Sequence, residues 1–128
     1  MPLESIKGPV LVNVFGSWCP PCRGEIPLLR KVYRSGKAKI IGIDIEEPNI
    51  KAGQDFVVKA GITWPILQDP KSVTKSAFGM GVPITWFLNK DGVVTHRQVG
   101  ALSTRSANGL YLLVWNIKAS PVSSRLSV

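Results

Sequence analysis

The stretch from Pro9 to Leu29, PVLVNVFGSWCPPCRGEIPLL, decides the fold of this 128-residue chain. It begins with an apolar run, Val10 to Phe15, which is interrupted only by Asn13 and is typical of a buried strand. Two cysteines three positions apart come next, and apolar residues then recur at helical spacing as far as Tyr33. We therefore predict a buried strand that leads through a Cys-Pro-Pro-Cys loop into a helix.

Cys19 and Cys22 lie where this helix begins, and that position favours thiol–disulfide exchange. Only a thiolate attacks a disulfide, and the unpaired N–H groups at a helix N-terminus lower the pKa of a cysteine there. Cys22 follows one turn later, within reach to form a disulfide with Cys19. Pro21 suits the first helical turn, where a missing N–H costs nothing, and Pro20 and Pro21 together stiffen the loop. We expect Cys19 to be the accessible nucleophile and Cys22 its buried partner, with no other cofactor.

Two cysteines at this spacing have other uses. One is a pair of buried structural cysteines, although Trp18 and the two prolines beside them argue against it. Zinc takes four ligands, whereas the chain offers two thiols and the lone His96, which we interpret as a surface residue. We therefore predict no zinc site. A Cu(I) site built from the two thiols stays open as an alternative and would make the chain a metallochaperone.

The rest of the chain predicts a single α/β domain over residues 1–128. Alternating strands and helices followed by a hairpin give a mixed sheet covered by helices. The expected strands are Lys39–Ile45, Trp64–Leu67, Ile84–Leu88 and Val93–Val99, the last two joined by a loop at Asn89–Gly92. The expected helices are one capped by Asn49 and running through Lys59, a short one at Ser72–Phe78, and a last one at Leu110–Ile117. Residues 118–128 are expected to form a loose tail.

Charge and hydropathy exclude some classes of function. The formal net charge is +8, yet the basic residues do not cluster and no aromatic-rich basic motif accompanies them, so we predict no nucleic-acid partner. Attraction to acidic partners or anionic lipid heads is the better interpretation of this charge. No apolar run approaches the roughly 20 residues that span a bilayer. Met1 to Gly8 also lacks the features of a signal peptide, so we expect any targeting segment to lie outside this sequence.

The opening stretch resembles the active site of the thioredoxin superfamily, in particular the extracytoplasmic branch of TlpA-, ResA- and DsbE (CcmG)-like proteins. Two further stretches are similar to that branch: AGITWPILQDP, residues 60–70, and FGMGVPITWFLNKDG, residues 78–92. The resemblance runs from about Pro2 to Leu102 and implies a thioredoxin-like fold with the inserted helix and strand of the branch. It departs from the family in two places, because the N-terminal β-hairpin is missing and the helix from Ser103 fits poorly.

The resemblance also implies roles for individual residues. Pro83 matches the family's cis-proline, which lies against the two sulfurs and exposes the backbone of the preceding residue, here Val82, to an incoming peptide. Trp18 matches a tryptophan that shields the first thiol and touches the substrate. Glu25 matches a carboxylate on the same helix face as Cys22, where it would hold or relay the proton of that thiol. Asn13 stands where cytosolic thioredoxins carry a buried Asp, and Asn cannot titrate, which strengthens the assignment of Glu25.

The function implied is that of a dithiol reductase which passes electrons to disulfides in client proteins, as in cytochrome c maturation. The expected partners are a client with a disulfide or CXXC thiols and a membrane thiol–disulfide electron donor, and the chain is expected to be a monomer. The resemblance places the native protein outside the cytoplasm, anchored or secreted through a segment absent here. A disulfide-forming oxidase is the alternative, although such proteins often carry a His between the cysteines, where this chain has Pro20 and Pro21. A peroxidase of the peroxiredoxin type is disfavoured, because its reactive cysteine does not lie in a Trp-Cys-Pro-Pro-Cys loop.

Overall fold

The structure, a computed structural model, describes residues 9–36, 38–75 and 81–102, which form a five-stranded mixed sheet with two helices. The strands are β1 (Val10–Phe15), β2 (Lys39–Ile45), β3 (Ile66–Asp69), β4 (Ile84–Leu88) and β5 (Val94–Val99); the helices are α1 (Pro20–Arg34) and α2 (Ile50–Lys59). Their order across the sheet is β3-β2-β1-β4-β5. β2 is parallel to β1 and β3, while β4 is antiparallel to β1 and β5. The predicted α/β fold with a central mixed sheet is confirmed.

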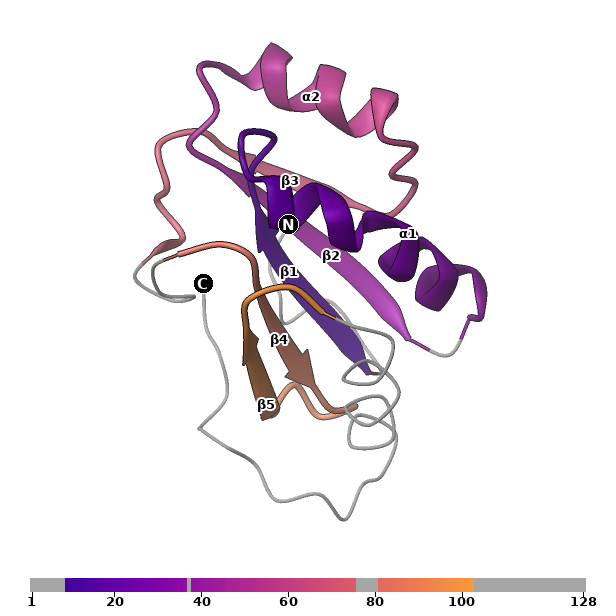
Figure 1. The fold of residues 1–128 in the computed structure, drawn as a ribbon. Coiled ribbons are helices and arrows are strands. Elements are labelled where there is room, and N and C mark those ends of the chain that lie inside the picture. Colours follow the sequence, from indigo (N-terminus) through magenta and orange to yellow (C-terminus); the bar gives the residue numbers. More distant parts are fainter. Residues whose placement is uncertain (1–8, 37, 76–80, 103–128) are drawn as a thin grey trace.

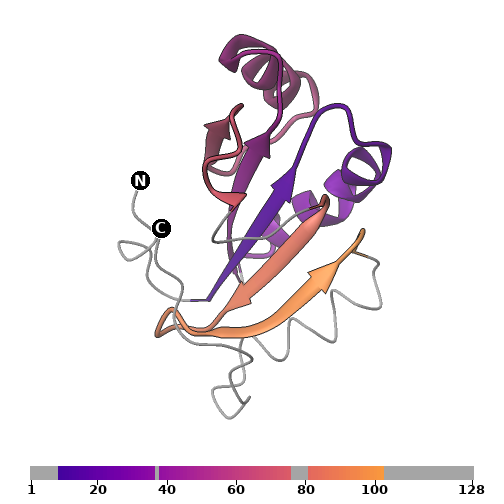
Figure 2. The same ribbon diagram turned by 90° about the vertical axis from the view of Figure 1, so that its left-hand side faces the viewer.

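Both helices cover the same face of the sheet (Figure 1, Figure 2). Side chains alternate along β1, so Leu11 and Phe15 join one buried cluster while Val10, Val12 and Val14 join a second cluster on the other face. The first cluster includes both cysteines and the inward side chains of α1, and residues of α2 pack against it. The end of β1 and the start of α1 are therefore fixed by the same core that surrounds the cysteines.

The predicted helix capped by Asn49 is confirmed as α2. The Asn49 side chain accepts a hydrogen bond from the backbone N–H of Ala52 over 2.8 Å, which satisfies one of the unpaired donors at the helix start. Gly61 follows the helix with a φ of 71°, the left-handed conformation that glycine adopts without strain. Together α2 and β3 form the inserted helix and strand that the resemblance implied.

The predicted strand Trp64–Leu67 is shifted by two residues, because β3 begins at Ile66. Pro65 has no N–H to give to a ladder, and only its carbonyl is used, as acceptor for the N–H of Gly42. The Trp64 side chain instead packs in the core against Tyr33, with ring centroids 5.7 Å apart. Pro65 is therefore the last residue before β3 and does not belong to the strand.

The hairpin predicted at Ile84–Leu88 and Val93–Val99 is present as β4 and β5. The Asn89 side chain closes its loop by accepting hydrogen bonds from the backbone N–H groups of Asp91 and Val93. The predicted helix Leu110–Ile117 and the tail lie outside the described residues. Of the predicted helix Ser72–Phe78, residues 76–78 also lie outside them, and residues 72–74 are not helical.

Among the residues that the structure describes, no helix is both long enough and apolar enough to cross a membrane.

Candidate active site

Cys19 and Cys22 form a disulfide at the beginning of α1, with their Cα atoms 5.2 Å apart. Cys19 has extended backbone and is the N-cap residue of the helix. Its Sγ accepts a hydrogen bond from the backbone N–H of Cys22 over 3.3 Å. A sulfur in this position faces the unpaired donors and the positive end of the helix dipole, which favours its thiolate when the disulfide is reduced.

The expected exposure of Cys19 is not observed in this disulfide form. Cys19 is 4% exposed and Cys22 is 1% exposed. Cys19 is shielded because its Sγ turns toward the N–H of Cys22 to cap the helix, and both cysteines pack in the cluster that contains Phe15. The exposed part of the loop consists of Trp18, Pro20 and Pro21.

Trp18 lies beside the cysteines with 48% of its surface exposed. Its indole Nε1 donates a hydrogen bond to the carbonyl of Ile45 at the end of β2, over 3.2 Å. The ring lies back over Gly16, where an added Cβ would be only 2.4 Å from Nε1. Glycine at position 16 therefore allows the indole to cover the loop while one edge stays open to solvent.

Glu25 is a buried carboxylate, 2% exposed, on the inward face of α1. Its Oε1 accepts a hydrogen bond from Nδ2 of Asn13 over 2.7 Å, and its Oε2 accepts one from the backbone N–H of Leu102 over 2.9 Å. Burial raises the pKa of the Glu25 carboxyl above its usual value, although the bonds from Leu102 and Asn13 act in the opposite direction. Such a group can accept a proton near neutral pH more readily than an exposed glutamate.

The link between Asn13 and Glu25 is a feature that sequence reasoning missed. Asn13 was expected only to fill the place of a titratable residue, whereas it donates directly to Glu25 and also to Oγ1 of Thr85, at 3.1 Å. The signal in the sequence was a lone amide in the apolar run of β1. A buried amide needs partners of its own, and one partner of Asn13 is the carboxylate.

The resemblance implied a cis peptide bond before Pro83, and the structure contains one. The peptide bond between Val82 and Pro83 is cis, Pro83 is buried, and half-buried Val82 packs against the cluster that holds the two sulfurs. His96, which was interpreted as a surface residue, is half-buried and meets Phe87 edge-on, with ring centroids 6.0 Å apart. His96 belongs to β5 and has no described contact with the cysteines.

Two further acidic residues near the loop were not singled out from the sequence. Glu47 accepts hydrogen bonds from both the backbone N–H and the hydroxyl of Ser17, at 2.7 Å and 2.5 Å. Asp44 is fully buried in β2, where it interrupts the apolar run KIIGIDI as Asn13 interrupts VLVNVF. A polar residue inside an apolar strand was the available signal for both Asn13 and Asp44.

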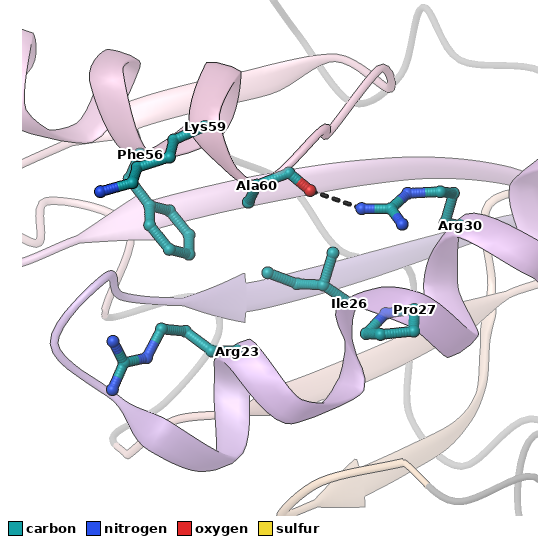
Figure 3. Close-up of a pocket in the computed structure, with 7 residues that line it drawn as sticks. All are labelled: Arg23, Ile26, Pro27, Arg30, Phe56, Lys59 and Ala60. Carbon is teal, nitrogen blue, oxygen red and sulfur yellow. Dashed lines mark hydrogen bonds between the residues drawn. The ribbon is translucent and has the colours of Figure 1, made fainter.

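An open pocket lies between α1 and α2, beginning one residue after Cys22 (Figure 3). Its apolar part consists of Ile26, Pro27, Phe56 and Ala60, and its cations are Arg23, Arg30 and Lys59. The guanidinium of Arg30 donates a hydrogen bond to the carbonyl of Ala60, and this bond bridges the two helices (Figure 3). No acidic residue lines the pocket, so the pocket is basic.

Within residues 9–36, 38–75 and 81–102, no three His, Cys, Asp or Glu side chains are grouped so that they could hold a metal ion.

Comparisons with known proteins show which family the chain belongs to. The model of the AhpC/TSA family matches residues 1–97. The thiol-disulfide oxidoreductase ResA of Bacillus thuringiensis is 31% identical over 112 residues, covering 84% of this chain and 64% of that protein. The thiol:disulfide interchange protein CycY of Rhizobium leguminosarum is 31% identical over 123 residues, covering 93% of this chain and 66% of that protein.

Solved structures share the fold. The structure of StoA from Bacillus subtilis matches with a TM-score of 0.70 and 25% identity, over 84% of this chain and 83% of that one. The chain spans less than two thirds of the length of the ResA and CycY relatives. The family match and the Cys-Pro-Pro-Cys site at the start of α1 together show that this chain belongs to the AhpC/TSA family, as a thioredoxin-like protein similar to the TlpA/ResA/DsbE-like thiol–disulfide oxidoreductases.

Proposed function

We propose that this chain is a protein thiol–disulfide oxidoreductase that works as a dithiol reductase of client disulfides. The observation that carries the proposal is the Cys19–Cys22 disulfide at the N-terminus of α1, together with the buried Glu25 on the same helix. The names of the ResA and CycY relatives describe the same class of reaction in those proteins.

In the proposed reaction, the Cys19 thiolate attacks one sulfur of the client disulfide. A mixed disulfide forms and the other client sulfur leaves as a thiolate. Cys22 then loses its proton, and its thiolate attacks the Sγ of Cys19, which releases the second client sulfur. Two electrons pass to the client and the Cys19–Cys22 disulfide remains. A thiol–disulfide electron donor must reduce it before the next turnover.

Glu25 is the proton acceptor that we propose for Cys22. Cys22 and Glu25 are separated by one helical turn and both lie on the buried face of α1. The raised pKa of Glu25 makes its carboxylate a better base than an ordinary glutamate. Its bonds from Asn13 and Leu102 fix the direction in which the carboxylate points.

The client would bind to the exposed residues around the Cys19–Cys22 disulfide. Trp18, Pro20 and Pro21 supply exposed surface next to the cysteines, while Val82 and Pro83 would supply a backbone edge for an extended peptide. Because Cys19 is only 4% exposed in the disulfide form, we propose that client binding displaces the surface that covers it, so that binding and attack are coupled.

By the same resemblance we propose that the protein works outside the cytoplasm as a monomer. Its clients would include CXXC motifs that must be reduced to thiols during cytochrome c maturation. Its electron donor would be a membrane thiol–disulfide protein. The absence of a His between the cysteines favours a reductase over an oxidase, because a histidine there would stabilise the Cys19 thiolate of the reduced form and so make the disulfide a stronger oxidant.

The reduction potential of the Cys19–Cys22 pair tests the direction. A value close to that of thioredoxin, about −270 mV, supports the reductase, whereas one near about −120 mV would show an oxidase. Turnover of a protein disulfide with an artificial dithiol donor should accompany the low potential. Cys19→Ser should abolish turnover, and Cys22→Ser should accumulate mixed disulfides with clients. Tight Cu(I) binding without any disulfide reduction would favour the metallochaperone instead.

A further inference from the structure

The loop that precedes Cys19 is tied to the segment that follows β2. Ser17 donates two hydrogen bonds to Glu47, one from its backbone N–H and one from its hydroxyl. The indole of the next residue, Trp18, donates to the carbonyl of Ile45. Three hydrogen bonds therefore connect two consecutive residues of the active-site loop with residues 45–47, which lie 27 to 30 positions further along the chain.

The backbone at Glu46 is what turns Glu47 toward this loop. Glu46 is exposed and has a φ of 55°, in the left-handed region that residues other than glycine seldom adopt. Strained backbone of this kind persists where the surrounding contacts over-determine it, and it is frequent at functional sites. The neighbouring Glu47 is only 5% exposed, so the turn puts a carboxylate inside the protein beside Ser17.

Asp44 lies next to this arrangement and is 0% exposed. In the register of the sheet it stands between Phe15 of β1 and Gln68 of β3. Gly53 of α2 covers it so closely that an added Cβ would be 2.6 Å from Oδ2 of Asp44 and 2.0 Å from Oε1 of Gln68. Neither oxygen of Asp44 accepts a hydrogen bond of ordinary length and angle from a described group, although the neighbouring Gln68 amide partly stabilises its charge and lowers its pKa.

No cation compensates Asp44 among the residues that the structure describes. Glu47, in the segment after β2, is the charged group that acts on Asp44. The neighbours of Asp44 in the sheet are Gln68 of β3, with its amide, and Phe15 of β1, with its aromatic ring. The charged residues of α2 closest to Gly53, Lys51 and Asp55, pair with each other at 2.8 Å on the exposed side of the helix.

A single proton resolves this conflict. Two ionised carboxylates can only accept hydrogen bonds, and a buried charge without a donor is strongly unfavourable. A proton on Asp44 removes the charge and supplies an O–H that can donate to Glu47. Burial and the neighbouring Glu47 raise the pKa of Asp44 to about 8, and Gln68 opposes them. Although burial acts against it, bonds from Asp44 and Ser17 hold the pKa of Glu47 below its usual value.

We propose that Asp44 and Glu47 form a proton-sharing carboxyl pair that positions Ser17 and Trp18 ahead of Cys19. With the proton in place, Asp44 donates to Glu47 and Glu47 holds both donors of Ser17. When Asp44 ionises, repulsion between the carboxylates pushes Glu47 off Asp44 and loosens its grip on Ser17. The consequence for catalysis rests on the proposed function, in which Cys19 is the attacking cysteine, whereas the pairing itself does not.

The pairing is tested in the oxidised protein, where neither cysteine titrates. The amide proton chemical shift of Ser17, followed by NMR from about pH 6 to about pH 10, should show a step near pH 8 in the wild type. Asp44→Asn should remove that step, because an amide donates to Glu47 at every pH in this range. Glu25→Gln is the matched control, since it removes a buried acid outside the pair and should leave the step in place. A wild-type shift without a step, or a step that persists in Asp44→Asn, would overturn the proposal.

The positioning role is tested with the reduced protein. Glu47→Ala should slow the attack of Cys19 on a protein disulfide by about tenfold, the scale of one charge-assisted hydrogen bond. Glu47→Gln should restore most of that rate near pH 7, because its amide oxygen still accepts one bond from Ser17. Equal rates in Glu47→Ala and wild type would refute positioning. If Glu47→Ala fails to fold, the pH dependence of the same rate in Asp44→Asn decides: it should lack the change near pH 8 that the wild type shows.

The two experiments distinguish a failure of the carboxyl pair from a failure of the proposed reductase function. The Ser17 titration is independent of which cysteine attacks, so it can succeed even if the reductase function fails. If the protein reduces disulfides but the chemical shift of its Ser17 amide proton does not change with pH, the proposed function stands and the carboxyl pair is refuted.

Discussion

Asn13 in the middle of β1 donates a hydrogen bond to Glu25 in α1 over 2.7 Å, although the two residues are twelve positions apart. The Cys19–Cys22 loop lies between them in the sequence, so this bond joins the strand before the loop to the helix after it. An amide that holds a carboxylate can fix the position of a proton acceptor without competing for the proton itself. The group that titrates is therefore Glu25 on α1, and not the strand residue Asn13, which only holds the carboxylate in place.

Replacing Glu25 with Gln should change the chemistry of Cys22 more than that of Cys19. The substitution keeps the size of the side chain and removes its charge, so the pKa of the Cys22 thiol should fall because a nearby negative charge disappears. Resolution of a mixed disulfide should also slow, because Cys22 loses its proton acceptor. Thiolate absorbance against pH and stopped-flow rates for each step measure both effects, and a shift of half a pKa unit, about 0.7 kcal/mol, is detectable.

Asp91→Asn provides the control for this experiment, because Asp91 is an exposed acid in the loop between β4 and β5. It should leave both the titration and the rates unchanged. Titrations and rates in Glu25→Gln that match the wild type would mean that Glu25 has only a structural role.

Removing the Asn13 amide should destabilise the protein. Asn13→Ala leaves Oε1 of Glu25 and the hydroxyl of Thr85 without their buried donor, and such losses cost about 1–3 kcal/mol. The pKa of Glu25 should rise further, because the bond from Asn13 is one of the two interactions that lower it. Urea unfolding and the pH dependence of mixed-disulfide resolution test the two parts. Unchanged stability would show that another donor takes over.

Gly16→Ala should impair client exchange with little change in the fold. The added methyl would overlap the Trp18 ring, with 2.4 Å to Nε1 and 2.5 Å to Cε2. Because Trp18 is half-exposed, the ring can swing outward and lose its bond to Ile45. The rate with a protein disulfide should drop about fivefold, the scale of a hydrogen bond of about 1 kcal/mol, while the rate with a small disulfide stays closer to wild type.

Gly24→Ala is the matched control for Gly16→Ala. Gly24 lies in α1 two residues after Cys22, and an added Cβ there would meet nothing within 4 Å. Alanine is favoured over glycine in a helix by roughly 0.5–1 kcal/mol, so this variant should melt at a slightly higher temperature and exchange normally. If both variants exchange like the wild type, the position of Trp18 does not matter for the client.

The sequence predicted those parts of the site whose signals are local. The strand before the cysteines, the helix after them and the cap at Asn49 each depend on a few neighbouring residues, and the structure contains all three. The start of β3 was misplaced because Trp64 favours a strand by its propensity, whereas Pro65 prevents the pairing.

The polar contacts could not be predicted, because they depend on sheet register and on the phase of α1. Asn13 meets Glu25 only because Asn13 points to the helix face of the sheet while Glu25 points inward from α1. The approach of Glu47 to Ser17 also requires the left-handed turn at Glu46, which the residue type does not suggest. The sequence nevertheless contained a signal for both Asn13 and Asp44, although only Asn13 was singled out: each is a polar residue within an otherwise apolar stretch of its strand.

Asp44 should make the oxidised protein less stable as the pH rises. Its pKa is raised to about 8 in the folded protein from the ordinary 3.8, so between these values the unfolded chain has released a proton that the folded chain still holds. The unfolded state binds fewer protons there, and the free energy of unfolding therefore falls with rising pH, by up to about 1.4 kcal/mol for each pH unit, until it levels off above pH 8. Glu25 acts in the same direction above its ordinary value, whereas Glu47 and Asp69, with lowered pKa values, act in the opposite direction at acid pH.

The contribution of Asp44 is therefore read from the difference between wild type and Asp44→Asn, in which the other acids cancel. Urea unfolding of both proteins in the disulfide form, from about pH 5 to about pH 9, should show the variant gaining on the wild type with each step and the difference becoming constant above pH 8. Asp91→Asn, the exposed control, should run parallel to the wild type throughout. If Asp44→Asn also runs parallel, Asp44 is already ionised in the folded protein and shares no proton with Glu47.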